Sequence, residues 1–96
     1  MKTKRERMPE LPSLEEARLV IRNNQACYED WYIAGAILCS NKKSTFADLL
    51  ACLKRPEVKW PAAWVLHKRT RRPKKDGEAV TDPKDWSRYL KAKGLL

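Results

Sequence analysis

The sequence lacks the glycine-rich and catalytic signatures that would identify a common enzyme. Glycine occurs at only three positions, Gly35, Gly77 and Gly94. No glycine loop is therefore present to cradle a phosphate, and neither a nucleophile elbow nor an H-E-x-x-H zinc motif occurs. These absences argue against the phosphate-loop, hydrolase and metalloprotease classes.

Histidine and suitably placed carboxylates are also scarce. His67 is the single histidine, and it lies within an expected helix, where we expect a hydrogen-bonded or solvent-facing side chain rather than a general base. The acidic pairs Glu15/Glu16 and Glu29/Asp30 are sequence neighbours, and neighbours on a helix point about 100° apart. They do not converge on one substrate. We therefore expect no catalytic residue and a protein that is not an enzyme.

Long hydrophobic runs are absent. The longest uncharged, largely apolar run is "WYIAGAILCSN", 11 residues from Trp31 to Asn41, whereas a helix needs about 20 to cross a bilayer. The first residues, "MKTKRERMPELP", carry charges without the apolar stretch of a secretory signal. We therefore expect a soluble, cytoplasmic protein without a membrane partner.

The three cysteines do not form a metal or disulfide pattern. Cys27, Cys39 and Cys52 are odd in number, and no C-x₂-C knuckle occurs. With His67 they would make a Cys₃His set, but the spacings are long for one. We predict three buried free thiols that act as small hydrophobic residues, with no metal and no cofactor.

What the sequence does contain is a set of helical patterns. A chain of 96 residues, 43% of them apolar, is long enough for one small domain. No segment shows the alternation of a strand, so we predict an all-α fold of about five short helices around one core. The expected parts are a flexible basic arm over residues 1–12 and a helical domain over 13–96, with helices at 14–23, 26–39, 45–54, 61–72 and 83–93.

Capping residues support these helices. Ser13 with Glu16 forms a capping box at the first helix. Ser44 or Thr45 caps the third, with Asp48 at the N3 position when Thr45 is the cap. Pro61 suits the first turn of the fourth helix. The fifth has Thr81 or Asp82 as its cap, Pro83 as its first residue and Gly94 past its end.

Apolar side chains indicate how the helices pack. The helix expected at 26–39 is apolar on most sides and small at Ala34 to Ala36, which places it at the centre of the domain. The next helix carries a full apolar stripe made of Phe46, Leu49, Leu50 and Leu53. Each of the four tryptophans, Trp31, Trp60, Trp64 and Trp86, falls where a core needs bulk. Trp60 is the one most open to exposure.

Positive charge is concentrated in one segment. The chain has a net charge of +9, and residues 54–75 hold nine Lys/Arg against Glu57 alone, a balance of +8. A helix end favours one or two cations through its dipole, so this density indicates an anionic partner as well. The predicted phosphate-contacting residues are Lys54, Arg55, Lys59, Lys68, Arg69, Arg71, Arg72, Lys74 and Lys75.

Two classes of partner fit this segment. The first hypothesis is nucleic acid, DNA before RNA, bound by a small regulatory or accessory protein. The expected helices at 45–54 and 61–72 resemble a helix-turn-helix only loosely, because their joint is long and the cations crowd the end of the second helix. The alternative is an acidic face of a larger protein complex, which would require an exposed apolar patch beside the charges. The oligomeric state stays open.

Overall fold

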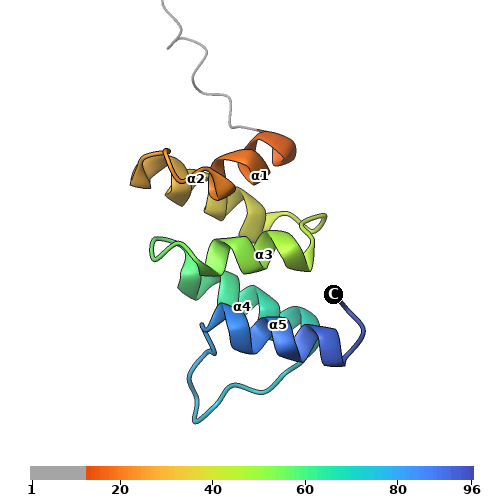
Figure 1. Cartoon of the computed structure of the whole chain (residues 1–96). Helices are drawn as coiled ribbons and strands as arrows, with labels where there is room; N and C mark the ends of the chain where they lie inside the picture. The colour runs from red at the N-terminus through yellow and green to blue at the C-terminus, as the bar shows by residue number, and fades with distance from the viewer. Residues whose placement is uncertain (1–12) are drawn as a thin grey trace, which may run out of the picture.

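The structure is a computed structural model that describes residues 13–96 as five helices and their connections. The helices are α1 (Leu14–Arg22), α2 (Tyr28–Ser40), α3 (Phe46–Leu53), α4 (Lys59–Thr70) and α5 (Pro83–Ala92) (Figure 1). No strand occurs in the described part of the chain, which confirms the all-α prediction. The predicted helix bounds differ from these by two residues or fewer. The predicted basic arm, residues 1–12, lies outside the described residues. None of the helices within residues 13–96 has the length and apolar character needed to span a membrane.

Two of the expected capping boxes are present. Ser13 Oγ accepts a hydrogen bond from the Glu16 N–H at 3.1 Å, and the Glu16 carboxylate accepts one from the Ser13 N–H at 2.9 Å. At α3, Thr45 and Asp48 exchange the same pair of hydrogen bonds, at 3.1 and 2.9 Å. These contacts satisfy amide groups that a helix start leaves without partners, so the sequence alone fixes where α1 and α3 begin.

The central helix is α3 and not α2, contrary to the sequence prediction. α3 packs against all four other helices, with Leu49, Cys52 and Leu53 buried (Figure 1). α2 packs mainly against α1 and exposes one long side to solvent. α3 takes the centre because its eight residues are short enough to be covered on all sides and its apolar stripe is continuous.

Asp48 joins α3 to α1 through a buried carboxylate. Besides its capping contact with Thr45, this carboxylate accepts hydrogen bonds from Arg18 Nε at 2.8 Å and from an Arg22 Nη at 3.1 Å. Burial acts to raise the pKa of Asp48, but the hydrogen bonds from Thr45, Arg18 and Arg22 outweigh it and hold that pKa below its ordinary value. The ionised form is thus the one that the fold stabilises.

The small-residue segment of α2 lets the start of α4 approach closely. A Cβ added at Gly35 would lie 2.4 and 2.5 Å from the two methyl carbons of Val58 and 2.7 Å from its Cβ. Both residues are buried. The absence of a side chain at Gly35 therefore lets Val58, in the turn before α4, lie directly against the α2 backbone.

α4 begins and ends two residues before the predicted bounds. It begins at Lys59 because the first four amides of a helix need no acceptor, so Pro61 fits at the third position as well as at the first. It ends at Thr70 because Arg71 adopts a left-handed conformation, with φ of 60°. The Thr70 hydroxyl then accepts a hydrogen bond from the Arg72 N–H at 3.2 Å.

The structure corrects the prediction that all three cysteines are buried. Cys52 is buried, Cys39 is partly buried and Cys27 is exposed, and all three are free thiols. Cys27 is exposed because it is the N-cap of α2 and precedes the first buried turn. In the described part of the chain no three His, Cys, Asp or Glu side chains are grouped as metal ligands.

Replacing Asp48 by Asn tests the buried carboxylate. We expect the free energy of unfolding at neutral pH to fall by about 1–2 kcal/mol, because charge-assisted hydrogen bonds are lost while both arginines stay partly solvated. Because the pKa of Asp48 is lower in the folded protein than in the unfolded chain, where it is near 3.9, the ionised carboxylate stabilises the fold at pH values above about 3.9. This stabilisation is lost as the pH falls through the pKa of the folded state. In urea titrations from neutral to acidic pH, the free energy of unfolding should therefore fall more steeply for the wild type than for the variant. Equal slopes in both proteins would contradict this role for Asp48.

Replacing Gly35 by Ala tests the contact between α2 and α4. Alanine favours a helix over glycine by about 1 kcal/mol, yet we expect a net loss of about 1–3 kcal/mol because the methyl group overlaps Val58. Val58→Ala creates room, so the double variant should be more stable than the sum of the two single losses predicts. A double-mutant cycle by urea denaturation measures this coupling. Additive losses would show that Gly35 does not limit the approach.

Candidate nucleic-acid interface

The nine cations of the predicted site divide into two groups. Three arginines, Arg55, Arg69 and Arg72, have hydrogen-bond partners inside the fold. The remaining six, which form no salt bridge within residues 13–96, are Lys54, Lys59, Lys68, Arg71, Lys74 and Lys75. The first group makes contacts that connect parts of the fold, whereas the second carries charge that no salt bridge within residues 13–96 neutralises.

Arg55 fastens the turn after α3 to the end of α1. Its Nε donates to the Ile21 carbonyl at 2.9 Å, and an Nη donates to Asn24 Oδ1 at 2.9 Å. Its guanidinium lies 4.2 Å from the centre of a Trp31 ring. These contacts use part of the hydrogen-bonding edge and one flat face of the guanidinium, so Arg55 has a structural role, and its phosphate contact stays a prediction.

Arg69 fastens α4 to the loop between α2 and α3. It donates to the Asn41 carbonyl at 2.9 Å and also to the Ser44 carbonyl. Its charge also acts on the thiols beside it. A hydrogen bond from Cys52 lowers the pKa of Cys39, burial opposes this shift, and the Arg69 guanidinium adds to it. Arg69 therefore connects α4 to this loop, and its phosphate contact stays a prediction.

Arg72 is held between the loop after α4 and α5. One Nη donates to Asp85 Oδ1 at 2.9 Å. The guanidinium lies 4.6 Å from a Trp86 ring centre and 4.5 Å from that of Tyr89. Its other Nη is buried, so the Arg72 side chain is turned inward. Its phosphate contact likewise stays a prediction.

His67 uses both ring nitrogens inside the fold. The Val80 N–H donates to Nε2 at 2.9 Å, and Nδ1 lies 2.9 Å from the Arg72 carbonyl. A carbonyl only accepts, so Nδ1 carries the proton and donates it, which leaves a neutral ring. The ring also meets Trp86 edge to face, with centroids 4.9 Å apart. His67 is thus buried and fully hydrogen-bonded, one of the two environments expected for it.

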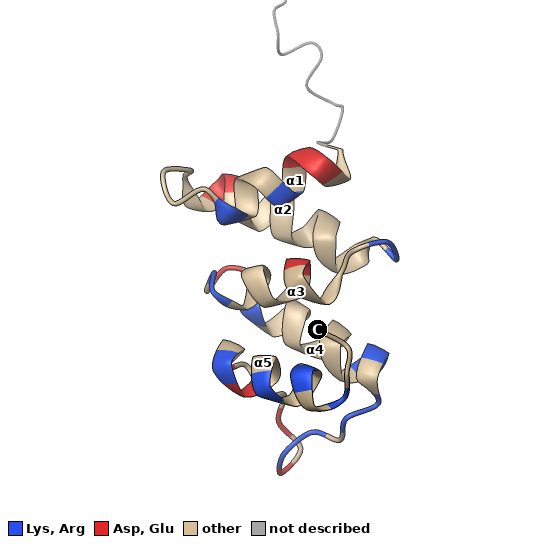
Figure 2. Cartoon of the chain, turned by 45° about the vertical axis from the view of Figure 1, so that its right-hand side comes forward, with Lys and Arg blue, Asp and Glu red and all other residues tan. Residues whose placement is uncertain are grey.

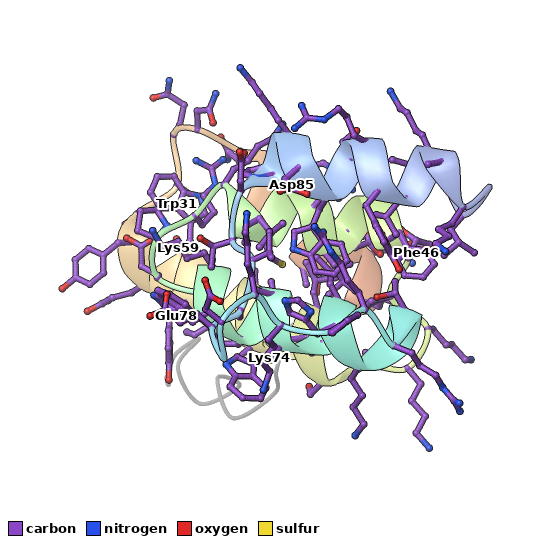
Figure 3. All side chains as sticks on the ribbon, turned by 90° about the horizontal axis from the view of Figure 1, so that it is seen from below. Trp31, Phe46, Lys59, Lys74, Glu78 and Asp85 are labelled. Carbon is purple, nitrogen blue, oxygen red and sulfur yellow. The ribbon has the colours of Figure 1, made fainter. Side chains whose placement is uncertain are left out.

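The exposed side of α4 carries two indoles in line with cations. Trp60, Trp64 and Lys68 follow one another at spacings of four residues, which places them on one side of the helix, and Arg71 comes directly after the helix end. Trp60 is 50% exposed and Trp64 is 53% exposed. Lys74 Nζ, from the following loop, lies 3.0 Å from the centre of a Trp64 ring (Figure 3). These five residues are called the basic face below.

The exposure of Trp64 corrects the prediction that this residue belongs to the core. The inward side of α4 is filled by Ala62, Ala63 and Leu66, each with no exposed surface. Alanines bring the backbone of α4 close to its neighbours, so no space is left on that side for an indole. Trp86, in contrast, is fully buried as predicted, and Trp31 is partly buried. Trp60, which the sequence also placed where a core needs bulk but as the one most open to exposure, is exposed.

A cleft opens beside the Trp64 indole. Its lining residues are Trp64, His67, Lys68, Arg72, Pro73 and Lys74. The apolar part of the cleft comes from the indole and the proline, and the free cations stand at its edges. A flat aromatic group together with an anionic group matches this combination in chemistry.

A second exposed surface, on α2, was missed at the level of sequence. Tyr28, Tyr32 and Ile33 are 63%, 59% and 42% exposed. The signal was present, because the helix predicted at 26–39 was apolar on most sides and a small domain has room for only one such side in its core. Tertiary packing then decided which side remained outside.

Comparison of the chain with family models, with characterised proteins and with solved structures gave no match. Figure 2 shows most lysines and arginines on α4, α5 and the loop between them, in the lower half of the molecule.

Replacing Trp64 or Trp86 by alanine tests which of the two side chains belongs to the core. Trp64→Ala should change the free energy of unfolding by no more than about 0.5 kcal/mol, because the indole is largely in water. Trp86→Ala should cost about 3–5 kcal/mol, because it leaves a cavity beside His67. Urea denaturation of both variants measures this difference. A loss of several kcal/mol for Trp64→Ala would place that indole back in the core.

Proposed function

We propose that the protein binds nucleic acid through the basic face, and that it binds single strands of DNA or RNA in preference to duplexes. The observation that carries the proposal is the pair of exposed indoles, Trp60 and Trp64, aligned with Lys68 on one side of α4, with Arg71 directly after the helix end. Aromatic platforms beside a positively charged groove are the usual way to bind single strands, because every base has a face that can stack.

Electrostatics supports the same partner. The six free cations lie on α4, directly before it and directly after it. Cations that meet phosphates release condensed counterions, which gives binding a steep dependence on salt. If four of the six contact phosphates, the logarithm of affinity for a single strand falls with the logarithm of salt with a slope of about −3.

The contact between Lys74 and Trp64 fits this mechanism. In the free protein the Lys74 ammonium lies 3.0 Å from a Trp64 ring centre, so it covers one face of the indole. A base that stacks on this face displaces the ammonium, which then becomes available to the phosphate beside that base. Lys59 stands in a looser relation to Trp60, with its Nζ 6.0 Å from a ring centre.

Groove reading of duplex DNA has less support. The recognition helix of a helix-turn-helix contacts base edges with its first residues. The first residues of α4 are Lys59, Trp60 and Pro61, and only Lys59 among them offers hydrogen bonds suited to a base edge. Five residues, 54–58, separate α3 from α4, and the connection holds no glycine.

An acidic protein surface is the second candidate. An exposed apolar patch beside the charges was the feature that this alternative required, and Trp60 and Trp64 supply it. Tryptophan and arginine are the residue types most common at interface hot spots. The two candidates differ in salt dependence, since a protein interface built around an indole loses less affinity as salt rises.

Binding to oligo(dT), oligo(U) and a duplex of equal length tests the proposal. We expect tighter binding to the single strands in fluorescence anisotropy, with a steep salt slope between about 50 and 200 mM. Trp64→Ala should weaken single-strand binding by about 1–3 kcal/mol at constant salt, because one stacking platform is lost. Equal binding to single strand and duplex, with no effect of Trp64→Ala, would show that charge alone drives the interaction.

Two triple variants of equal charge provide the control. Lys68→Ala/Arg71→Ala/Lys75→Ala removes three exposed cations at the end of α4 and after it, and Lys84→Ala/Arg88→Ala/Lys91→Ala removes three exposed cations of α5. The first should reduce affinity and flatten the salt slope by about 2 for three lost phosphate contacts, and the second should change both much less. Equal effects would disprove a localised site, and no binding of any probe at low salt would disprove the function.

A further inference from the structure

The exposed apolar surface of α2 forms one side of a cleft with acidic walls. Its lining residues are Tyr28, Glu29, Tyr32, Ile33 and Glu57, and these five are called the acidic cleft below. Tyr28 and Tyr32 are one helical turn apart, as are Glu29 and Ile33, so two adjacent rows of α2 face the cleft. Three large apolar side chains gathered on one surface, two of them more than half exposed, mark an interaction site more often than single exposed residues do.

Glu57 makes this cleft suited to a positively charged partner. Its Oε1 is shielded from solvent and has no hydrogen-bond donor among the described residues. A carboxylate with one oxygen shielded from water and without a donor raises the free energy of the folded state, and the charge of a lysine or arginine that approaches the cleft offsets part of this cost. Glu29 adds a second carboxylate to the cleft, and the two tyrosine rings offer faces that favour a cation. The cleft is thus suited to a basic side chain flanked by apolar groups.

The chain itself carries a surface of that description. The basic face presents Lys68, Arg71 and Lys74 beside the half-exposed Trp60 and Trp64. It shares no residue with the acidic cleft, so the two are distinct surfaces of one molecule. Figure 2 shows the carboxylates of α1 and α2 in the upper half and most cations in the lower half, where α5 and the loop before it also carry carboxylates.

We propose that the acidic cleft of one molecule binds the basic face of a second copy of this chain. The two surfaces differ, so the contact is head to tail, and every added copy leaves one free cleft and one free basic face. Each copy carries a net charge of +9, and the resulting repulsion opposes association beyond the contact itself. We therefore expect assembly to grow with protein concentration rather than to stop at a tight dimer.

This inference does not rest on the proposed nucleic-acid function. A second copy and a nucleic acid would occupy the same basic face, so an oligonucleotide would compete with self-association. Loss of nucleic-acid binding alone would leave the head-to-tail contact intact, and the reverse also holds. The two proposals are therefore tested separately.

Two surface variants and their mixture test the contact. The cleft variant, Glu29→Lys/Glu57→Lys, keeps its basic face, and the face variant, Lys68→Glu/Lys74→Glu, keeps its acidic cleft. Sedimentation equilibrium on nucleic-acid-free protein should show a wild-type mass that rises with concentration. Each variant alone should stay at 11.2 kDa. The equimolar mixture should form a one-to-one dimer and grow no further, because only one pair of intact surfaces is available.

A second cleft variant controls for misfolding of the first. Tyr28→Ala/Tyr32→Ala removes two exposed side chains and no core residue, so it should keep the helical circular dichroism and the melting temperature of the wild type. It too should stay monomeric alone and should dimerise with the face variant. A wild type that is monomeric at every concentration overturns the proposal and would leave the cleft to a basic segment of another protein. Folded variants that assemble like the wild type, or a mixture that stays monomeric, also overturn it.

Discussion

The imidazole of His67 fixes the loop between α4 and α5, and this loop places Lys74 against Trp64. The backbone of α5 lies close to that of α3 and not to that of α4, so side chains connect α5 and the loop before it to α4. His67 donates to the Arg72 carbonyl at the start of this loop and accepts from the Val80 N–H at its end. Trp86 closes the arrangement, since its ring meets that of His67 and its indole N–H donates to the Val80 carbonyl. The loop therefore keeps Lys74 against Trp64.

The nine cations of residues 54–75 differ in their partners according to whether they are arginines or lysines. All three cations with internal partners are arginines, and five of the six others are lysines. A guanidinium is flat, weakly hydrated and rich in donors, so it satisfies several carbonyls and stacks on an indole at the same time. An ammonium is compact and strongly hydrated, and it remains in water. The fold thus uses the arginines to connect its helices, whereas the lysines and Arg71 form no salt bridge within residues 13–96.

The two candidate surfaces have a common origin in an excess of apolar side chains over what so small a core can enclose. α4 fills its inner side with two alanines and Leu66, and its indoles remain outside. α2 uses Gly35 and Ala34 to approach its neighbours, and its tyrosines remain outside. Cations border the first surface and carboxylates the second, so the same packing produces two exposed surfaces of opposite charge. Both proposals follow from this arrangement.

The sequence by itself determined where the helices lie, because their starts depend on contacts within one turn. The capping boxes at Ser13 and Thr45 and the proline at the start of α5 are local signals, and each acts at the predicted place. The apolar spacing of α3 likewise identified its buried stripe. Only the tertiary structure decided which helix is central, which tryptophan is exposed and which cations are free. These outcomes depend on partners that are 13 to 34 residues away along the chain, as with Arg72 and Asp85 or Arg55 and Ile21, and helical periodicity carries no information at that range.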